Sequence, residues 1–413
     1  MTELKDLTPG TLVKGVTSDG PGDSDIAQIL RNFAGDPQKA DGVARFLGFE
    51  PIPNPEDQLA GPLTAGLRQF FGRSDDKFGV HQLYRVGTRQ AHPASAGLWI
   101  STLSDWGQRS SDRDRPRRQI ARALTTEIPE RRSLALLVPP PQDERGEAEL
   151  IFPRTAVSDS GDSSGQTVTS IRALIDLNTP TRFHRDLLHE LRIPDGAGLA
   201  DISKLWREKF SVERVTTEFY KEYAAVRDRM AAVLVNHNQG HSVVQQLTDD
   251  EARAWATRQM GRVLFLWFLQ AKRWLGEPGG RGSTTYLLDL WNRRSETKEK
   301  EYYKGVLEPL FFDAMATGSS SSGEDPVLGY VPYLNGGLFR RSRQEDEIND
   351  EGGVSLPDEA FDPGDENSLL GLLSRYRFTT RESTPDDQSV DPDPELLGRV
   401  FENLYQGDER HDT

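Results

Sequence analysis

The chain has 413 residues, a formal net charge of −15 and a hydrophobic content of 35%, and it contains no cysteine. The absence of cysteine excludes disulfides, thiolate catalysis and cysteine-based zinc or iron–sulfur sites. The acidic charge argues against a protein that binds nucleic acid over its whole surface, because affinity for DNA comes mostly from neutralised phosphates.

The length predicts two or three domains, and the apolar pattern predicts a cytoplasmic protein without a membrane partner. The longest apolar run, VLFLWFL at 263–269, is shorter than the roughly 18 residues that span a membrane. The opening residues, MTELKDLTPG, lack the charged and apolar regions of a secretory signal.

Residues 1–58 are predicted to form an N-terminal extension with two helices across 24–48. In the first helix, apolar residues recur at the spacing of one helix face: Ile26, Ile29, Leu30 and Phe33.

Residues 59–156 are predicted to form an α/β domain with a central sheet. Runs rich in β-branched and aromatic residues predict strands at 81–89, 96–103, 131–141 and 147–154. An arginine-rich helix centred on 117–124 separates the first two strands from the last two. This β-β-α-β-β order is typical of helices packed on a sheet.

The low-complexity sequence at 157–168 predicts a linker, and a helical bundle domain is expected at 169–316. The sequence becomes helical from Ile171, and long helices are predicted at 210–236 and 249–275. The centre of the second long helix is apolar on all sides, so we expect it in the middle of the bundle.

Residues 317–413 are predicted to be a loop-rich connector that ends in a helix at 393–404. The predicted fold class is therefore α+β, or mixed, with an N-terminal α/β domain followed by a mainly α-helical domain.

Positive charge is concentrated at 109–132, which holds eight arginines and four acidic residues. This segment could follow a DNA backbone, or it could be a solvated helix face with local ion pairs. A second group of basic residues lies at 179–188, where the alternative is a polar helix face with Phe183 buried. The candidate DNA contacts are Arg113, Arg115, Arg117, Arg118, Arg122, Arg182 and Arg185.

His237 and His241 have the spacing of two metal ligands on a helix. The intervening NQG indicates a loop, and no glutamate completes an H-E-x-x-H pattern. No metal site is expected.

Four segments carry a resemblance to a known family. They are RVLFLWFLQAKRWL at 262–275, EYYKGVLEPLFF at 301–312, GYVPYLNGGLF at 329–339 and YRFTTRESTPDDQSVDPDPELLGRVFENL at 376–404. In this order they resemble the region upstream of the methyltransferase core in type IIG restriction–modification enzymes. The methyltransferases of the BREX and DISARM phage-defence systems carry a similar block.

The resemblance implies that the helix at 393–404 leads into an S-adenosylmethionine-binding domain with an Asn-Pro-Pro-Tyr tetrapeptide. That tetrapeptide does not occur in this sequence. We therefore expect the front portion of an adenine-specific DNA methyltransferase, with no cofactor in this chain and S-adenosylmethionine only in the missing part. The expected partners are DNA, bound weakly or conditionally, and a methyltransferase-core chain or other defence-system subunits.

Two groups of residues are candidate contacts with that missing part. The first is a tight turn, whose glycines are expected to allow positive φ. The second is the apolar face of the helix at 393–404. Together the candidates are Tyr333, Asn335, Gly336, Gly337, Leu397, Val400, Phe401 and Leu404.

The resemblance also implies an N-terminal nuclease or a relic of one. Such a nuclease needs two carboxylates and a lysine to hold Mg²⁺ and activate water. The strand at 97–103 is followed by Asp105 without a lysine, and Asp75 and Lys77 fall in a predicted loop. A degenerate nuclease-like domain in a non-catalytic scaffold is therefore expected. A residual Mg²⁺-dependent nuclease and a pure protein-interaction subunit are the alternatives.

Overall fold

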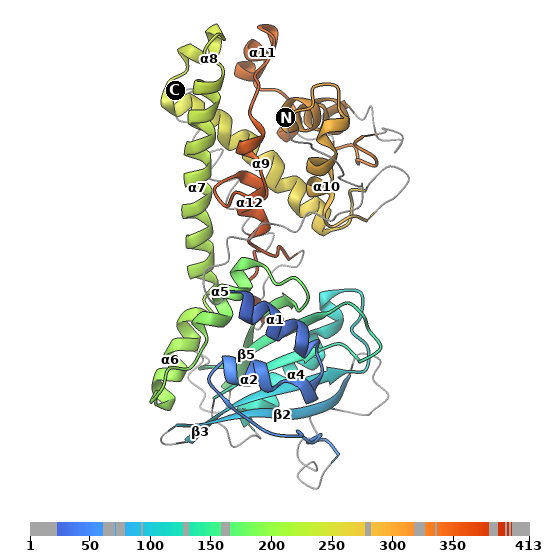
Figure 1. Cartoon of the computed structure of the whole chain (residues 1–413), viewed down its shortest axis with the longest axis vertical. Helices are drawn as coiled ribbons and strands as arrows, with labels where there is room; N and C mark the ends of the chain where they lie inside the picture. Colours follow the sequence, from blue (N-terminus) through green and yellow to red (C-terminus); the bar gives the residue numbers. More distant parts are fainter. Residues whose placement is uncertain are drawn as a thin grey trace, which may run out of the picture.

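A computed structural model describes residues 23–60, 71, 79–91, 94–126, 132–157, 166–276, 282–317, 327–334, 337–379, 387–392, 395 and 398. These residues form one seven-stranded mixed sheet and a set of helices, so the predicted α+β fold class is confirmed. In Figure 1 the sheet occupies the lower half of the molecule, and the longest helices rise above it.

The strands lie across the sheet in chain order: β1 (Glu50–Pro51), β2 (Val80–Ala91), β3 (Ala94–Leu103), β4 (Arg132–Val138), β5 (Glu147–Val157), β6 (Gln166–Asp176) and β7 (Asp387–Ser389). Neighbouring strands are antiparallel, except that β3 is parallel to β4 and β6 is parallel to β7. Helix α4 (Asp114–Thr126) makes the crossover that the parallel pair β3–β4 requires. The predicted β-β-α-β-β order is confirmed.

Successive residues of the strands point to opposite faces, and each face has its own apolar core. One face packs on α4 through residues that include Leu83, Trp99, Ala135, Leu137, Ile151, Ile120 and Leu124. The other face belongs to the main core, which includes Leu98, Ile100, Leu134, Leu136, Leu150 and Phe152. The helices that contribute to this second core beside the sheet are α1 (Asp23–Phe33), α2 (Asp41–Phe46), α5 (Arg182–Glu190) and α6 (Leu199–Lys209).

The main core continues into the helices above the sheet. They are α7 (Val212–His237), α8 (Ser242–Gln246), α9 (Asp249–Ala271), α10 (Tyr286–Arg293), α11 (Arg343–Asp350) and α12 (Leu369–Ser374) (Figure 1). Two π-helical segments, Tyr303–Leu307 and Leu310–Met315, follow α10 in the chain. Short 3-10 turns lie at Pro37–Lys39, Ser110–Arg113, Arg294–Glu296, Gly337–Phe339 and Asp358–Ala360.

The two long predicted helices are confirmed as α7 and α9. The side chain of Ser211 accepts a hydrogen bond at the start of α7, and Thr248 with Glu251 forms a capping box at the start of α9. The centre of α9 is buried in the core, as its uniformly apolar sequence predicts. Within the described part of the chain, no helix combines the length and apolar character needed to cross a lipid bilayer.

The prediction of a helix from Ile171 is wrong, because this residue lies in β6. Strand β6 pairs with β5 along its whole length, from Glu147 opposite Asp176 to Val157 opposite Gln166. Ile171, Ala173 and Ile175 point into the main core, and this period of two is that of a strand. The predicted linker at 157–168 therefore overlaps the hairpin between β5 and β6.

The segment predicted as a connector also contributes a strand to the sheet. Strand β7 pairs in parallel with β6, with Ser170 opposite Asp387 and Arg172 opposite Ser389. The backbone N–H of Val390 donates to the carbonyl oxygen of Arg172 over 2.9 Å. Residues more than 200 positions after the other strands thus complete the N-terminal sheet.

Candidate nucleic-acid interface

The arginines around α4 divide into a buried pair and an exposed row. Arg113 and Arg117 are 4% and 0% exposed. Arg115, Arg118 and Arg122 are exposed, and their spacing of i, i+3 and i+7 places them on one helix face.

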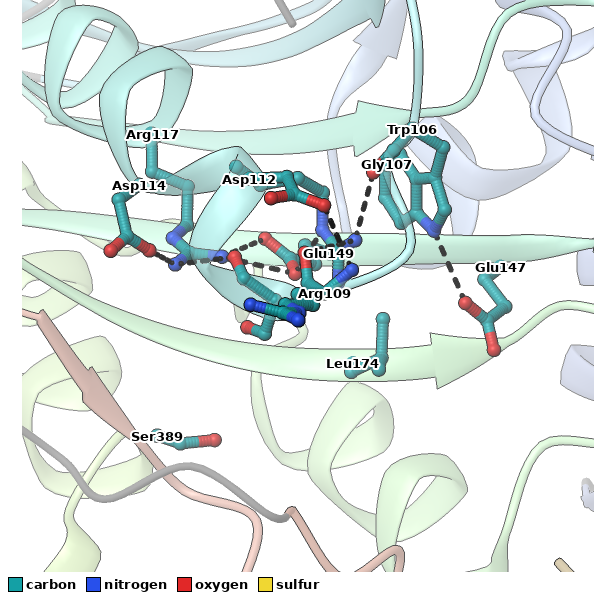
Figure 2. A network of polar contacts seen from close by, with 12 residues as sticks. Trp106, Gly107, Arg109, Asp112, Asp114, Arg117, Glu147, Glu149, Leu174 and Ser389 are labelled. Carbon is teal, nitrogen blue, oxygen red and sulfur yellow. Dashed lines mark hydrogen bonds and ion pairs between the residues drawn. The ribbon is translucent and has the colours of Figure 1, made fainter. Parts of the chain in front are cut away.

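The buried pair binds Glu149, which points from β5 towards α4. Nε of Arg113 donates to Oε1 of Glu149 over 2.7 Å, and Nη1 of Arg117 donates to Oε2 over 2.8 Å. Arg117 also pairs with Asp114, and the guanidinium of Arg113 lies 4.3 Å from the ring centroid of Trp106. Figure 2 shows Arg117, Asp114 and Glu149 close together at this position.

The charge of Glu149 is fixed by this arrangement. Burial would raise the pKa of the Glu149 carboxyl, but the guanidinium groups of Arg117, Arg113 and Arg172 outweigh burial and lower the pKa to about 2. The carboxylate therefore stays ionised and holds the start of α4 on the sheet.

This burial corrects part of the predicted DNA-contact set. Arg113 and Arg117 anchor α4 from the inside, and their guanidinium groups are not available to a phosphate outside. Arg115, Arg118 and Arg122 are the arginines of this segment that face outward, and a DNA contact through them stays a prediction.

The basic residues of α5 are held within the fold to different degrees. Arg185 is 6% exposed, so the prediction that it contacts DNA does not fit its position. Arg182 is half-buried and pairs with Asp186 and with Glu366. Phe183 is buried and its ring centroid lies 5.4 Å from that of Tyr376, as the alternative of a polar helix face with a buried phenylalanine predicts.

His184, between these arginines, joins α5 to the segment that follows β7. Its Nε2 lies 2.7 Å from Oδ1 of Asp391, and its Nδ1 lies 2.9 Å from the hydroxyl of Thr181. The other carboxylate oxygen of Asp391 accepts from the backbone N–H of Leu174 on β6 over 2.9 Å. His184 is fully buried and Thr181 caps α5. The contact therefore has a structural role, which is to join α5 to β6 and to the segment after β7.

The four segments that carry the family resemblance meet in the main core. The ring of Phe339 contacts Phe265 of α9 and Phe311 of the second π-helical segment, with centroids 5.9 Å apart in both cases. Phe378, from the fourth segment, packs edge-on against Phe268 of α9 at 5.1 Å. These segments, which are far apart in the sequence, therefore pack against one another in the fold.

Arg262 joins the segment at 262–275 to the segment at 329–339 by polar contacts that were not predicted from the sequence. It is 1% exposed within α9. Its guanidinium donates to the carbonyl oxygens of Leu338 and Arg340 over 2.8 and 2.9 Å, and to both oxygens of Glu345. Burial would raise the pKa of the Glu345 carboxyl, but its bonds with Arg262 outweigh burial and lower it.

The predicted interface residues are only partly within the described chain. Tyr333 is 48% exposed, and Trp274, which is 52% exposed, lies on the neighbouring segment. The backbones of Gly276 and Tyr330 pair in both directions and hold these two segments together. Gly337 begins a 3-10 turn and does not use the positive φ that a glycine allows. Asn335, Gly336, Leu397, Val400, Phe401 and Leu404 lie outside the described residues.

His241 and Asp105, two of the metal and nuclease candidates that the structure describes, lie in different parts of the fold. His241 caps α8, and its Nε2 lies 3.0 Å from the carbonyl oxygen of Ile348. Asp105 accepts a hydrogen bond from the backbone N–H of Gly107 in a turn. Asp75 and Lys77 lie outside the described residues. Among the residues that the structure describes, no group of three histidine, aspartate or glutamate side chains could hold a metal ion.

The sequence is similar to a protein of the archaeon Methanocaldococcus jannaschii. The two are 25% identical over 285 residues. The name of that relative assigns to it the activities of a type II restriction enzyme and a methyltransferase. The match covers 58% of this chain but 22% of the relative, so this chain corresponds to about a fifth of that protein. No family model and no solved structure matches the chain. The similarity supports a distant relation to restriction–modification proteins.

Proposed function

We propose that this chain is a non-catalytic scaffold and DNA clamp for the adenine-specific methyltransferase core of a restriction–modification or phage-defence system. The main support is the convergence of the four resembling segments on one core that also receives the N-terminal sheet. Strand β7 and the His184–Asp391 contact join the sheet to these segments. A DNA-binding surface on the sheet would thus be held rigidly relative to a methyltransferase core.

The surface that suits DNA is the exposed face of α4. Arg115, Arg118 and Arg122 present three guanidinium groups on one side, and the Glu149 cluster fixes that helix on the sheet. Guanidinium groups suit the geometry of phosphate oxygens. Contacts of this kind position a protein on DNA without reading its sequence.

The surface that suits a methyltransferase core is the pair of neighbouring segments with Trp274 and Tyr333. These are large aromatic side chains that the fold leaves half exposed, and aromatic residues are enriched in protein interfaces. Both belong to segments that carry the family resemblance.

The proposal is tested by the binding of a fluorescent 30-base-pair duplex to the full chain at several salt concentrations. A clamp binds the duplex at low salt without sequence preference, and replacing Arg115, Arg118 and Arg122 by Gln weakens binding. A chain that does not bind the duplex at low salt contradicts the DNA-clamping function.

A further inference from the structure

Two cavities meet at Arg154 on β5 and Arg207 on α6. One has a volume of about 270 Å³ and is lined by the end of α4, the start of β4, the end of β5 and α6. The other has a volume of about 370 Å³ and is lined by α6, the start of α7 and the segment around β7. Arg154 and Arg207 line both cavities, so the two guanidinium groups stand at their junction.

The core places these two arginines side by side. Phe152 and Arg154 are two residues apart on β5 and therefore point to the same face. The ring centroid of Phe152 lies 6.1 Å from that of Trp206 and 5.5 Å from that of Phe210. This aromatic packing fixes α6 against β5, and Arg207 follows Trp206 directly.

The smaller cavity has a basic and hydroxylic lining. The described residues that line it include no aspartate or glutamate. Its polar side chains are those of Arg132, Arg154, Arg207, Thr125, Ser133, Thr155 and Ser203. Nε of Arg132 donates to the hydroxyl of Ser203 over 2.6 Å, which fixes one guanidinium group at the wall.

Two observations indicate that this lining is incomplete without an anion. Neither Arg154 nor Arg207 forms an ion pair with any carboxylate in the described part of the chain. Burial and the nearby charge of Arg207 lower the pKa of Arg154, which is the effect of a like charge close by. The hydroxyl of Ser133, a residue only 4% exposed, has no hydrogen-bond partner among the described residues. Buried polar groups and adjacent like charges without partners are both costly.

The cavity also lies next to the exposed arginine row of α4. Thr125, which lines the cavity, follows Arg122 by three residues, and residues three apart are neighbours on a helix surface. A polyanion that contacts the row could therefore reach the cavity.

We propose that Arg132, Arg154 and Arg207 form a phosphate-binding site that takes a backbone phosphate of the DNA bound along α4. The planar forks of the arginines match phosphate oxygens, and the hydroxyl of Ser133 supplies a further donor. This site adds a phosphate contact to the proposed function, and the inference rests on the proposal that the chain clamps DNA.

The test measures binding to the full chain of a 30-base-pair duplex and, separately, of ATP. The variant carries Arg154→Gln and Arg207→Gln. The matched control carries Lys204→Gln and Arg343→Gln, which removes the same charge from exposed positions outside the cavity. Melting temperatures show whether each variant is folded. If the double variant is not folded, the exposed single variant Arg207→Gln is measured instead.

The proposal predicts that the double variant binds the duplex at least about tenfold more weakly than the control. Its slope of log affinity against log salt falls by about two, since each phosphate contact contributes about 0.9. The single variant lowers the slope by about one.

Three other outcomes distinguish a failure of the phosphate-binding site from a failure of the DNA-clamping function. Duplex binding with an unchanged slope in the double variant overturns the phosphate site and leaves the clamp intact. ATP binding that the double variant abolishes, without duplex binding, supports the phosphate site and contradicts the clamp. Binding of neither ligand overturns both.

Discussion

Nε2 of His184 lies 2.7 Å from Oδ1 of Asp391, although 207 residues separate the two in the chain. Both side chains are buried, at 0% and 3% exposure. The hydroxyl of Thr181 accepts from the backbone N–H of His184, so its own hydrogen is available to Nδ1 and leaves Nε2–H to donate to Asp391. One carboxylate thus joins α5, β6 and the segment after β7.

Replacing Asp391 by Ala should release β7 from the sheet. The change leaves the ring of His184 and the N–H of Leu174 buried without an acceptor, so we expect a loss of about 2–4 kcal/mol in the free energy of unfolding. Hydrogen exchange read by mass spectrometry should show faster exchange across 387–392. Gln388→Ala serves as the control, because its side chain lines a cavity and is not part of this contact. Unchanged protection in the Asp391 variant would show that strand pairing alone holds β7.

Glu149→Gln should destabilise the fold at neutral pH by about 3–5 kcal/mol, because the buried guanidinium of Arg113 loses its carboxylate partner and that of Arg117 keeps Asp114 but loses Glu149. The exposed residue Glu144 provides the control, Glu144→Gln. Urea unfolding at pH 7 measures both variants.

The same substitution should change the response to acid. The folded-state pKa of Glu149 is lowered from 4.5 to about 2, so its ionised form stabilises the fold above pH 4.5 and this stabilisation is lost as the pH falls towards 2. The difference in unfolding free energy between wild type and Glu149→Gln should therefore shrink between pH 5 and pH 3. A constant difference over that range would mean that Glu149 is not an acid-sensitive anchor.

Arg262→Met should cost about 3–5 kcal/mol, because Glu345 is then buried without its partner. The double variant Arg262→Met with Glu345→Met should be less destabilised than the single variant, since the unpaired charge is gone. It should not reach wild-type stability, because the carbonyl oxygens of Leu338 and Arg340 still lack their donor. Equal losses in the single and double variants, measured by urea unfolding, would contradict the pairing.

The pattern of apolar residues was sufficient to predict most of the fold. The strands and helix of the β-β-α-β-β region and the long helices α7 and α9 follow from local periodicity. The sequence of β6 predicted a helix because Ala173, Leu174 and Ile175 are consecutive apolar residues that pack on both faces of the sheet, and such a run does not distinguish a strand from a helix. Strand β7 has three residues and takes its register from β6, so no local signal marks it.

The candidate site could be predicted only in part. The charge of the α4 segment was visible, but its division into buried and exposed arginines depends on Glu149, which lies 32 residues after Arg117. Arg262 did offer a signal, since it is a charged residue in an apolar helix without an acidic residue three or four positions away. Its partner Glu345 lies 83 residues later, and only the fold brings them together.

The chain should bind neither S-adenosylmethionine nor its demethylated product. The sequence contains no Asn-Pro-Pro-Tyr tetrapeptide and no Gly-rich turn between a strand and a helix for that cofactor. Isothermal calorimetry at micromolar protein should show no heat of binding for either compound. A micromolar dissociation constant would place a cofactor site in this chain and refute the scaffold function.

The salt dependence of duplex binding shows whether the exposed face of α4 binds DNA. The full chain is compared with a variant that carries Arg115→Gln, Arg118→Gln and Arg122→Gln, and with a control that carries Arg192→Gln, Lys204→Gln and Arg343→Gln. The α4 variant should lower the slope of log affinity against log salt by up to about three, equally for unrelated duplex sequences, while the control leaves the slope nearly unchanged. Equal slopes for the α4 variant and the wild type would contradict a DNA-clamping role and make this face an ordinary solvated surface.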